Sequence, residues 1–583
     1  MAVDDHGDGA DTAVVSGTSA DARLKVVLLW HMHQPQYQDR VSGSYQLPWT
    51  YLHAIKDYTD MAAHLEAVPG ARAVVNFAPI LLEQIADYAA QLRGFLDDSG
   101  AIRDPLLAAL VTPALPTDSE SRSVLIKACL RANESRVIRR FAAYQRLADM
   151  APWFTEHPDA LAYVSDQYIV DLLVWYHLAW LGETVRRNDT RVVRLMDKGS
   201  SYSLHDRREL LAIIRGLLEG LVPRYARLAE RGQAELSVTP YAHPILPLLI
   251  DLHSAHDTLP DAPLPREPLY PGGEERARWH IREGIEVFRH HFGFAPAGCW
   301  PAEGGLSVPT LRLLHEAGFT WAAGGESVLH NSLARAGHAP HAMKEAWLYR
   351  PYSVMDSGMS CFFRDDGLSD LIGFTYASWH ADDAVANLVS HLEKIAAACH
   401  GHADRVVTLA LDGENAWEHY PENGYYFLSA LYAQLAQHPQ LELSTFSDCL
   451  EAFPAKRLRA FVAGSWVYGT FSTWIGSRDK NRGWEMLIDA KRAFDAQAAQ
   501  LVPELRALAE RQLAVCEGSD WFWWFGDDNP AATVSDFEHL FRLHLGTLYQ
   551  LLGLEPPEYL AQSFTRGGGV PLHGGVMRPG QPG

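Results

Sequence analysis

The chain has few cysteines for its length, and their spacing excludes two classes of protein. Six cysteines occur in 583 residues, and no two of them form a CxxC pair. A zinc ribbon needs such pairs, and a small secreted protein held by disulfides needs many cysteines at short spacing. We therefore expect reduced and mostly buried thiols. They are Cys129, Cys299, Cys361, Cys399, Cys449 and Cys516.

Positive charge and long apolar runs are also scarce. Lys and Arg number 50 against 71 Asp and Glu, a formal net charge of −21, which disfavours nucleic acid and anionic membranes as partners. The first twenty residues contain neither Lys nor Arg, so they lack the basic region of a secretory signal. No run approaches the roughly 18 apolar residues of a membrane span. We expect a cytoplasmic protein; its oligomeric state is not fixed by the sequence.

From Lys25 onward, short apolar runs alternate with long segments of helical periodicity. This rhythm is typical of β/α units, whose parallel strands are buried on both faces. Past Phe453 helical patterns dominate, and the last helix is predicted to begin at a capping box of Ser535 and Glu538 and to end at Gly553. The clearest strand candidates are residues 26–30, 73–77, 235–238, 320–323 and 406–411.

These patterns predict four parts of the chain. Residues 1–22 are expected to form a disordered arm and residues 23–452 a β/α barrel. Residues 453–560 are expected to form a helical C-terminal domain, and the Gly- and Pro-rich residues 561–583 a disordered tail.

Polar clusters follow several of the predicted strands. The active site of a β/α barrel lies at the carboxyl ends of its strands, so these clusters are expected to meet at one mouth of the barrel. The clusters are His31 to Pro35, Tyr241 to Pro244, Trp300 to Glu303 and Asp412 to Glu414.

Two carboxylates, Glu303 in CWPAEGG and Asp412 in TLALDGENAWE, are the strongest catalytic candidates. Hydrolysis of a sugar bond uses two carboxyl groups, one to attack or to activate water and one to protonate the leaving oxygen. Each motif alone also fits a structural role, Glu303 as a helix cap and Asp412 with Gly413 as a turn. Their occurrence together favours catalysis.

Five motifs occur in order along the chain. They are HQP at 33–35, GQAEL through YAHPILP with Glu235 and His243, WPAEGG with Glu303, LDGENAWE with Asp412, and SDWFWW with Asp520, Trp521 and Trp523. Together they resemble glycoside hydrolase family 57, a family of retaining enzymes that act on α-glucans. The resemblance extends from about Lys25 to Leu552 and implies an incomplete seven-stranded (β/α)7 barrel followed by a C-terminal helical domain.

The resemblance implies a role for each matched residue. Glu303 is the expected nucleophile and Asp412 the expected general acid/base, about 5 to 5.5 Å apart in a retaining enzyme. His33 is expected to bind sugar hydroxyls, with Glu235 and His243 nearby.

Aromatic residues inside the motifs are expected to contact the glucan. Trp300, Trp417 and Trp523 are the candidates, because tryptophan faces stack on sugar rings. If the fifth motif is helical, Asp520 and Trp523 share one face, so the C-terminal domain is expected to complete the cleft.

The HxH pair of His31 and His33 raises the possibility of zinc, but a zinc site usually needs a third protein ligand. A buried structural role is the preferred interpretation of His31. Double displacement through a glycosyl-enzyme requires neither metal nor organic cofactor, and we expect none.

Within the family, two segments look like the α-amylase and amylopullulanase branch: residues 48–61 and 362–374. Arg364, Asp365 and Asp370 in the second segment fit a loop network of ion pairs equally well. The sequence thus predicts a retaining hydrolase of starch- or glycogen-like α-1,4-glucans, with α-1,6 cleavage left open.

Three alternatives stay open. The first is a 4-α-glucanotransferase or branching enzyme, which would use the same carboxylates with a sugar acceptor. The second is a zinc-dependent α-mannosidase or deacetylase, and the third is a glycan-binding protein without activity.

Overall fold

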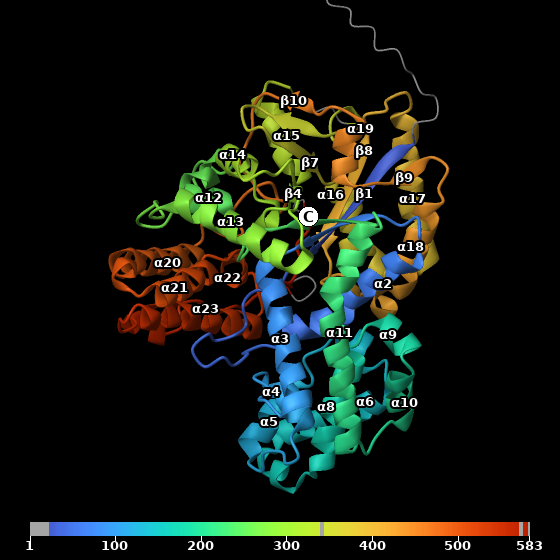
Figure 1. Ribbon diagram of the computed structural model, residues 1–583, viewed down its shortest axis with the longest axis vertical. Coiled ribbons are helices and arrows are strands. Elements are labelled where there is room, and N and C mark those ends of the chain that lie inside the picture. Colours follow the sequence, from blue (N-terminus) through green and yellow to red (C-terminus); the bar gives the residue numbers. More distant parts are fainter. Residues whose placement is uncertain (1–22, 339–342, 571–574, 581–583) are drawn as a thin grey trace, which may run out of the picture.

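The computed structural model describes residues 23–338, 343–570 and 575–580, so the predicted N-terminal arm lies outside the described residues (Figure 1). Seven parallel strands form a curled sheet in the order β7-β5-β4-β3-β2-β1-β8. They are β1 (Leu24–Met32), β2 (Ala73–Phe77), β3 (Ala234–Val238), β4 (Gly298–Cys299), β5 (Trp321–Gly324), β7 (Ser360–Phe363) and β8 (Val406–Asp412).

The two ends of this seven-strand series meet. Arg364, directly after β7, forms a parallel bridge with Thr408 of β8, and the amide of Asp365 donates to the Thr408 carbonyl at 2.8 Å. The sheet therefore closes through one short contact, which confirms the predicted (β/α)7 barrel. Three short strands flank it: β6 (Tyr352–Val354) is antiparallel to β7, β9 (Leu441–Leu443) pairs with β1, and β10 (Lys456–Leu458) pairs with β6.

The alternation of side chains along the strands divides the buried apolar residues into two clusters. Along β1, Val27 and Leu29 belong to one buried cluster, which also contains Trp300 and Trp321, whereas Val26 and Leu28 belong to the larger cluster that includes the helices. Successive side chains of a strand point to opposite faces, so a barrel strand packs inward and outward in turn.

A long helical excursion leaves the barrel between β2 and β3, in the lower half of Figure 1. It runs from α3 (Pro79–Asp98) through α4 (Pro105–Val111) and α8 (Asp166–Ala179) to α11 (Leu204–Glu230). Between α4 and α8 lie α5 (Ser119–Ala128), a π-helical turn (Glu134–Ile138), α6 (Ala142–Ala148), α7 (Ala151–Glu156) and a 3₁₀ turn (Pro158–Tyr163), and between α8 and α11 lie α9 (Glu183–Asn188) and α10 (Thr190–Lys198).

The remaining helices mostly connect and cover the strands. In chain order they are α1 (Trp49–His53), α2 (Thr59–Ala67), α12 (Leu246–Ile250), α13 (Gly273–Phe292), α14 (Val308–Glu316), α15 (Glu326–Arg335), α16 (Asp366–Asp370), α17 (Ala381–Ala398), α18 (Tyr425–Ala436) and α19 (Phe446–Ala452). Within the described ranges, none of the helices has the length and apolar character that a membrane crossing requires.

The C-terminal helices pack together beside the barrel, on the left of Figure 1. They are α20 (Arg478–Gln497), α21 (Pro503–Cys516), α22 (Ser519–Trp524) and α23 (Ala531–Leu551). The predicted cap at Ser535 is wrong, because α23 already begins at Ala531 and the Glu538 carboxylate instead accepts from Arg542 at 2.6 Å. The predicted end at Gly553 agrees with its positive φ of 72° just after the helix.

Parts of the expected disordered tail make specific contacts. The Thr565 hydroxyl donates to Asp479 at 2.7 Å and accepts from the Gly526 amide at 3.0 Å. Residues 575–580 contact the barrel, whereas residues 571–574 and 581–583 lie outside the described part of the chain. All six cysteines are buried and unpaired, as expected.

Candidate active site

A cavity of about 660 Å³ lies at the carboxyl ends of the barrel strands. It combines residues from β1, the β4 and β8 ends and α22, which are distant in sequence. Six of the nine predicted site residues line it: His33, His243, Glu303, Asp412, Asp520 and Trp523.

Glu303 is held in an unusual backbone conformation just after β4. Its φ of 57° and ψ of 25° lie in the left-handed region, which a residue other than glycine adopts only where its surroundings fix it. Trp466 Nε1 donates to Glu303 Oε2 at 3.0 Å, and Ser519 Oγ donates to Oε1 at 3.2 Å. These two donors aim the carboxylate and favour its ionised form.

Asp412 is the last residue of β8 and pairs in register with His31 of β1. Asn415 Nδ2 donates to its Oδ2 at 2.8 Å. Because the strand end faces the cavity, the carboxyl group shares that space with Glu303.

Glu303 and Asp412 are both buried, and the charge of Asp412 affects the pKa of Glu303. Desolvation, the Asp412 charge and the Asp520 charge raise the pKa of Glu303 to about 8. Desolvation raises the pKa of Asp412 to about 6, against a lowering contribution from Asn415. Between about pH 6 and 8 the pair therefore carries one proton, which in the empty cavity resides mainly on Glu303.

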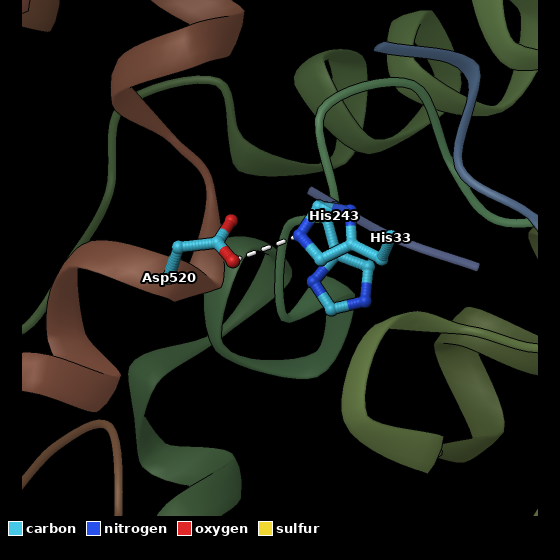
Figure 2. Close-up of side chains that lie close together, drawn as sticks. All are labelled: His33, His243 and Asp520. Carbon is cyan, nitrogen blue, oxygen red and sulfur yellow. Dashed lines mark hydrogen bonds and ion pairs between the residues drawn. The ribbon is translucent and has the colours of Figure 1, made fainter. Parts of the chain in front are cut away.

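Three histidines stack beside the carboxyl pair. The rings of His33 and His243 lie 3.8 Å apart between centroids at 13°, and the His31 ring lies 5.0 Å from that of His243. His33 Nε2 is 2.8 Å from Asp520 Oδ1, which joins the barrel to helix α22 (Figure 2). Asp520 and Trp523 of α22 thus line the same cavity as the barrel residues, in agreement with the expectation that they share one face toward it.

His31 and His243 connect the barrel wall to Glu303 by hydrogen bonds. His31 Nδ1 lies 2.7 Å from Asn76 Oδ1, and its Nε2 lies 2.9 Å from His243 Nε2. His243 Nδ1 lies 2.8 Å from Ser519 Oγ, the group that donates to Glu303. Burial lowers the pKa of His31 to about 3 and that of His243 well below its ordinary value.

His33, His243 and Asp520 are also the one set among the described residues whose ligand atoms lie close enough to share a metal ion, within 4.8 Å of one another. Figure 2 shows the two imidazole rings one above the other with Asp520 to the side. Ring lone pairs point along the ring plane, so stacked rings do not aim them at one ion, and both nitrogens of His243 already have partners. The arrangement fits hydrogen bonding to a ligand better than zinc binding.

Glu235 lies outside the cavity, contrary to expectation. Its carboxylate accepts from Trp321 Nε1 at 2.7 Å and from the Ser447 amide at 3.1 Å. As the second residue of β3 it is at the amino end of the strand, the opposite mouth of the barrel, where it ties β3 and β5 to α19. Its role in this structure is to hold these elements together.

Trp300 and Trp417 are core residues instead of cavity residues. Trp300 is fully buried in the barrel interior, and its carbonyl accepts from Thr239 at 2.8 Å. Trp417 packs edge-on against Trp30 with ring centroids 5.7 Å apart, and its Nε1 donates to the Gly413 carbonyl. Both side chains pack beneath the segments that carry Glu303 and Asp412.

Trp466 also lines the cavity, and no local sequence signal marks it. Trp466 comes from the segment after the barrel, and Arg364 stacks over its ring at 5.0 Å. Arg364 also forms ion pairs with Asp370 at 2.6 Å and with Asp366 at 2.9 Å. These contacts agree with the interpretation of residues 362–374 as a loop with a network of ion pairs. The network lies on the cavity wall.

Two buried carboxyl groups in a cavity at the mouth of a β/α barrel are an arrangement that enzymes acting on glycosidic bonds use. The family model of glycosyl hydrolase family 57 matches residues 27–463, and the chain belongs to this family. A search of curated proteins gave no match.

Solved structures share the fold at low sequence identity. A family 57 branching enzyme from Thermococcus kodakaraensis is 15% identical, with a TM-score of 0.55 over 91% of this chain and 90% of that one. The α-amylase AmyC from Thermotoga maritima is 13% identical, with a TM-score of 0.54 over 91% and 93%. A 4-α-glucanotransferase from Thermococcus litoralis is 13% identical, with a TM-score of 0.50 over 91% and 60%.

Proposed function

We propose that the protein is a retaining hydrolase of α-1,4-glucans of the amylase or amylopullulanase type, with Glu303 as nucleophile and Asp412 as general acid/base. The observation that carries this proposal is the shared cavity of the two buried carboxyl groups, which hold one proton between them near neutral pH. A retaining reaction needs this charge state, one carboxylate and one carboxylic acid. The names of the structural neighbours, which include an amylase, support the substrate class.

In the proposed reaction, Glu303 attacks the anomeric carbon while Asp412 gives its proton to the departing glycosidic oxygen. The carbon–oxygen bond to the leaving sugar breaks and an ester bond to Glu303 forms. Asp412, now ionised, takes a proton from water, and the resulting attack breaks the ester and restores both groups.

The proton must reside on Asp412 when the glycosidic bond breaks, although Glu303 holds it in the empty cavity. Positive charge develops at the anomeric carbon in the transition state and favours an ionised carboxylate beside it. Trp466 Nε1 and Ser519 Oγ already donate to Glu303 and stabilise that ionised form. Substrate binding is therefore expected to move the proton from Glu303 to Asp412.

The deciding experiment is a product profile on amylose, glycogen and pullulan with reducing-end counts and the anomeric configuration of the first product. Hydrolysis with retention gives one new reducing end per cleavage, first in the α form. Longer chains or new branches without new reducing ends would instead identify a glucanotransferase or branching enzyme. A β product would contradict the retaining mechanism.

Variants assign the roles. Glu303→Gln and Asp412→Asn are each expected to lower kcat by at least about a thousandfold, since each removes one of the two reacting groups. The surface variant Glu219→Gln serves as the control. Loss of activity after chelation, together with bound zinc by elemental analysis, would favour the zinc enzyme, and binding without turnover would favour a glycan-binding protein.

We also propose a cytoplasmic location, which the six buried and unpaired thiols support.

A further inference from the structure

Residues 575–580, here called the C-terminal strap, are attached to the cavity wall at both ends. Trp523 Nε1 donates to the Gly575 carbonyl at 2.8 Å. At the other end, the Gly580 amide donates to Asp370 Oδ2 at 3.0 Å, and its carbonyl accepts from the Tyr468 amide at 3.0 Å. The strap lies beyond the residues that the family model matches.

The strap brings Val576, Met577 and Arg578 to the cavity lining. The Arg578 guanidinium lies 4.9 Å from the centroid of the Trp523 ring, so it covers one face of the tryptophan expected to stack on sugar. Its Nη2 is buried and has no hydrogen-bond partner among the described residues. Because Nη2 is closed to solvent, a ligand oxygen would contact the part of the Arg578 side chain that lines the cavity.

The attachment of the strap leads to the catalytic carboxylate. Asp370, which accepts from Gly580, also accepts from Arg364 Nη2 at 2.6 Å. Arg364 stacks over Trp466, whose Nε1 donates to Glu303. The strap is thus fixed to the same group of side chains that positions the nucleophile.

We propose that Arg578 is a substrate-binding residue, placed by the strap beside Trp523 so that its guanidinium donates hydrogen bonds to the hydroxyl oxygens of a bound glucosyl unit. The inference rests on the proposed function, because it assigns a glucan contact within the same cavity. Arginine suits this role, since its planar fork reaches two neighbouring oxygens while its face stays on the aromatic ring.

Arg578→Met in the full-length protein tests the contact, because methionine keeps an apolar side chain over Trp523 but removes every donor. With maltoheptaose, KM is expected to rise about tenfold, which corresponds to about 1.4 kcal/mol, while kcat stays within about twofold. Arg482→Met is the matched control, because the Arg482 guanidinium lies 4.9 Å from the Tyr559 ring and does not line the cavity. It is expected to leave both constants unchanged.

A second variant tests whether the strap holds Arg578 in position. A Cβ at Gly580 would lie 2.5 Å from Asp366 Cγ, so Gly580→Ala is expected to displace the strap and raise KM as Arg578→Met does. Gly568→Ala is its control, because nothing lies within 4 Å of a Cβ there. If the strap acts through Arg578, the double variant Gly580→Ala/Arg578→Met is expected to be no worse than either single variant.

Binding of maltoheptaose to Glu303→Gln, measured by calorimetry with and without Arg578→Met, gives a readout that does not need turnover. A weakening of about tenfold supports the proposal. An unchanged KM and an unchanged dissociation constant in Arg578→Met, with an unchanged melting temperature, would overturn it. If the wild type neither binds nor cleaves α-glucans, the proposed function itself fails, which is a distinct result.

Discussion

Ser519 Oγ donates a hydrogen bond of 3.2 Å to Oε1 of Glu303, across 216 residues of sequence. The serine opens helix α22 of the C-terminal region, whereas the glutamate follows strand β4 of the barrel. The same hydroxyl lies 2.8 Å from His243 Nδ1. One side chain from outside the barrel therefore links the expected nucleophile to the stacked histidines.

Ser519→Ala is expected to lower kcat by roughly 10- to 100-fold. A hydrogen bond to a charged group contributes roughly 1.5 to 3 kcal/mol, and this bond favours the ionised Glu303 that attacks the sugar. Steady-state kinetics on a maltooligosaccharide measures the effect. Ser447→Ala, which removes a hydroxyl bonded to Glu235 at the other mouth of the barrel, is the control and should keep kcat. Equal activity of both variants would contradict a positioning role for Ser519.

The pH dependence of kcat/KM is expected to be bell-shaped, with limbs near pH 6 and pH 8. Below about 6 both carboxyl groups are protonated and no nucleophile is present, and above about 8 both are ionised and no acid is present. The two limbs belong to the pair and not to single residues. Initial rates between pH 4 and 10 at substrate concentrations well below KM measure the profile. A flat profile from pH 5 to 9 would contradict shared protonation.

Glu235→Gln is expected to keep kcat and KM within about twofold of the wild type but to lower stability by roughly 1 to 2 kcal/mol. The carboxylate accepts from Trp321 and Ser447 at the amino end of β3, away from the cavity, and an amide replaces only part of these contacts. Kinetics and chemical denaturation separate the two effects. A rise in KM of tenfold or more without loss of stability would contradict this and support a role for Glu235 in substrate binding.

The sequence predicts the barrel and the two carboxylates because both depend on local patterns. Apolar runs such as residues 26–30 and 406–411 specify buried parallel strands, and a barrel brings the residues that follow them to one mouth. Glu235 lies at the amino end of its strand and does not follow it, so the same rule places it at the opposite mouth. The family resemblance predicts a place near His33, and the position of Glu235 in β3 contradicts it.

Other parts of the site depend on contacts between distant segments and have no local signature. Trp466 reaches Glu303 from 163 residues away, and the Gly580 amide reaches Asp370 from 210 residues away. Low-complexity composition predicts disorder for the tail, yet hydrogen bonds between the side chains of Trp523 and Asp370 and backbone groups hold residues 575–580 against α22 and the barrel. Trp300 and Trp417 belong to the motifs and yet are core residues. Membership of a motif therefore does not distinguish a residue that lines the cavity from one that packs in the core below it.

Glu303→Gln is expected to stabilise the fold increasingly as pH rises from about 4.5 to 8. The pKa of Glu303 is raised from 4.5 in the unfolded chain to about 8 in the fold, so over this window the folded state holds a proton that the unfolded state has lost. The free energy of unfolding of the wild type therefore falls through the window and levels off above pH 8, while glutamine contributes no such change. The difference is expected to reach a few kcal/mol at pH 8 and to vanish near pH 4. Urea denaturation of both proteins at several pH values measures it, with Asp412→Asn as a comparator whose window ends near pH 6. A constant stability difference between wild type and Glu303→Gln from pH 4 to 8 would show that folding does not raise the pKa of Glu303.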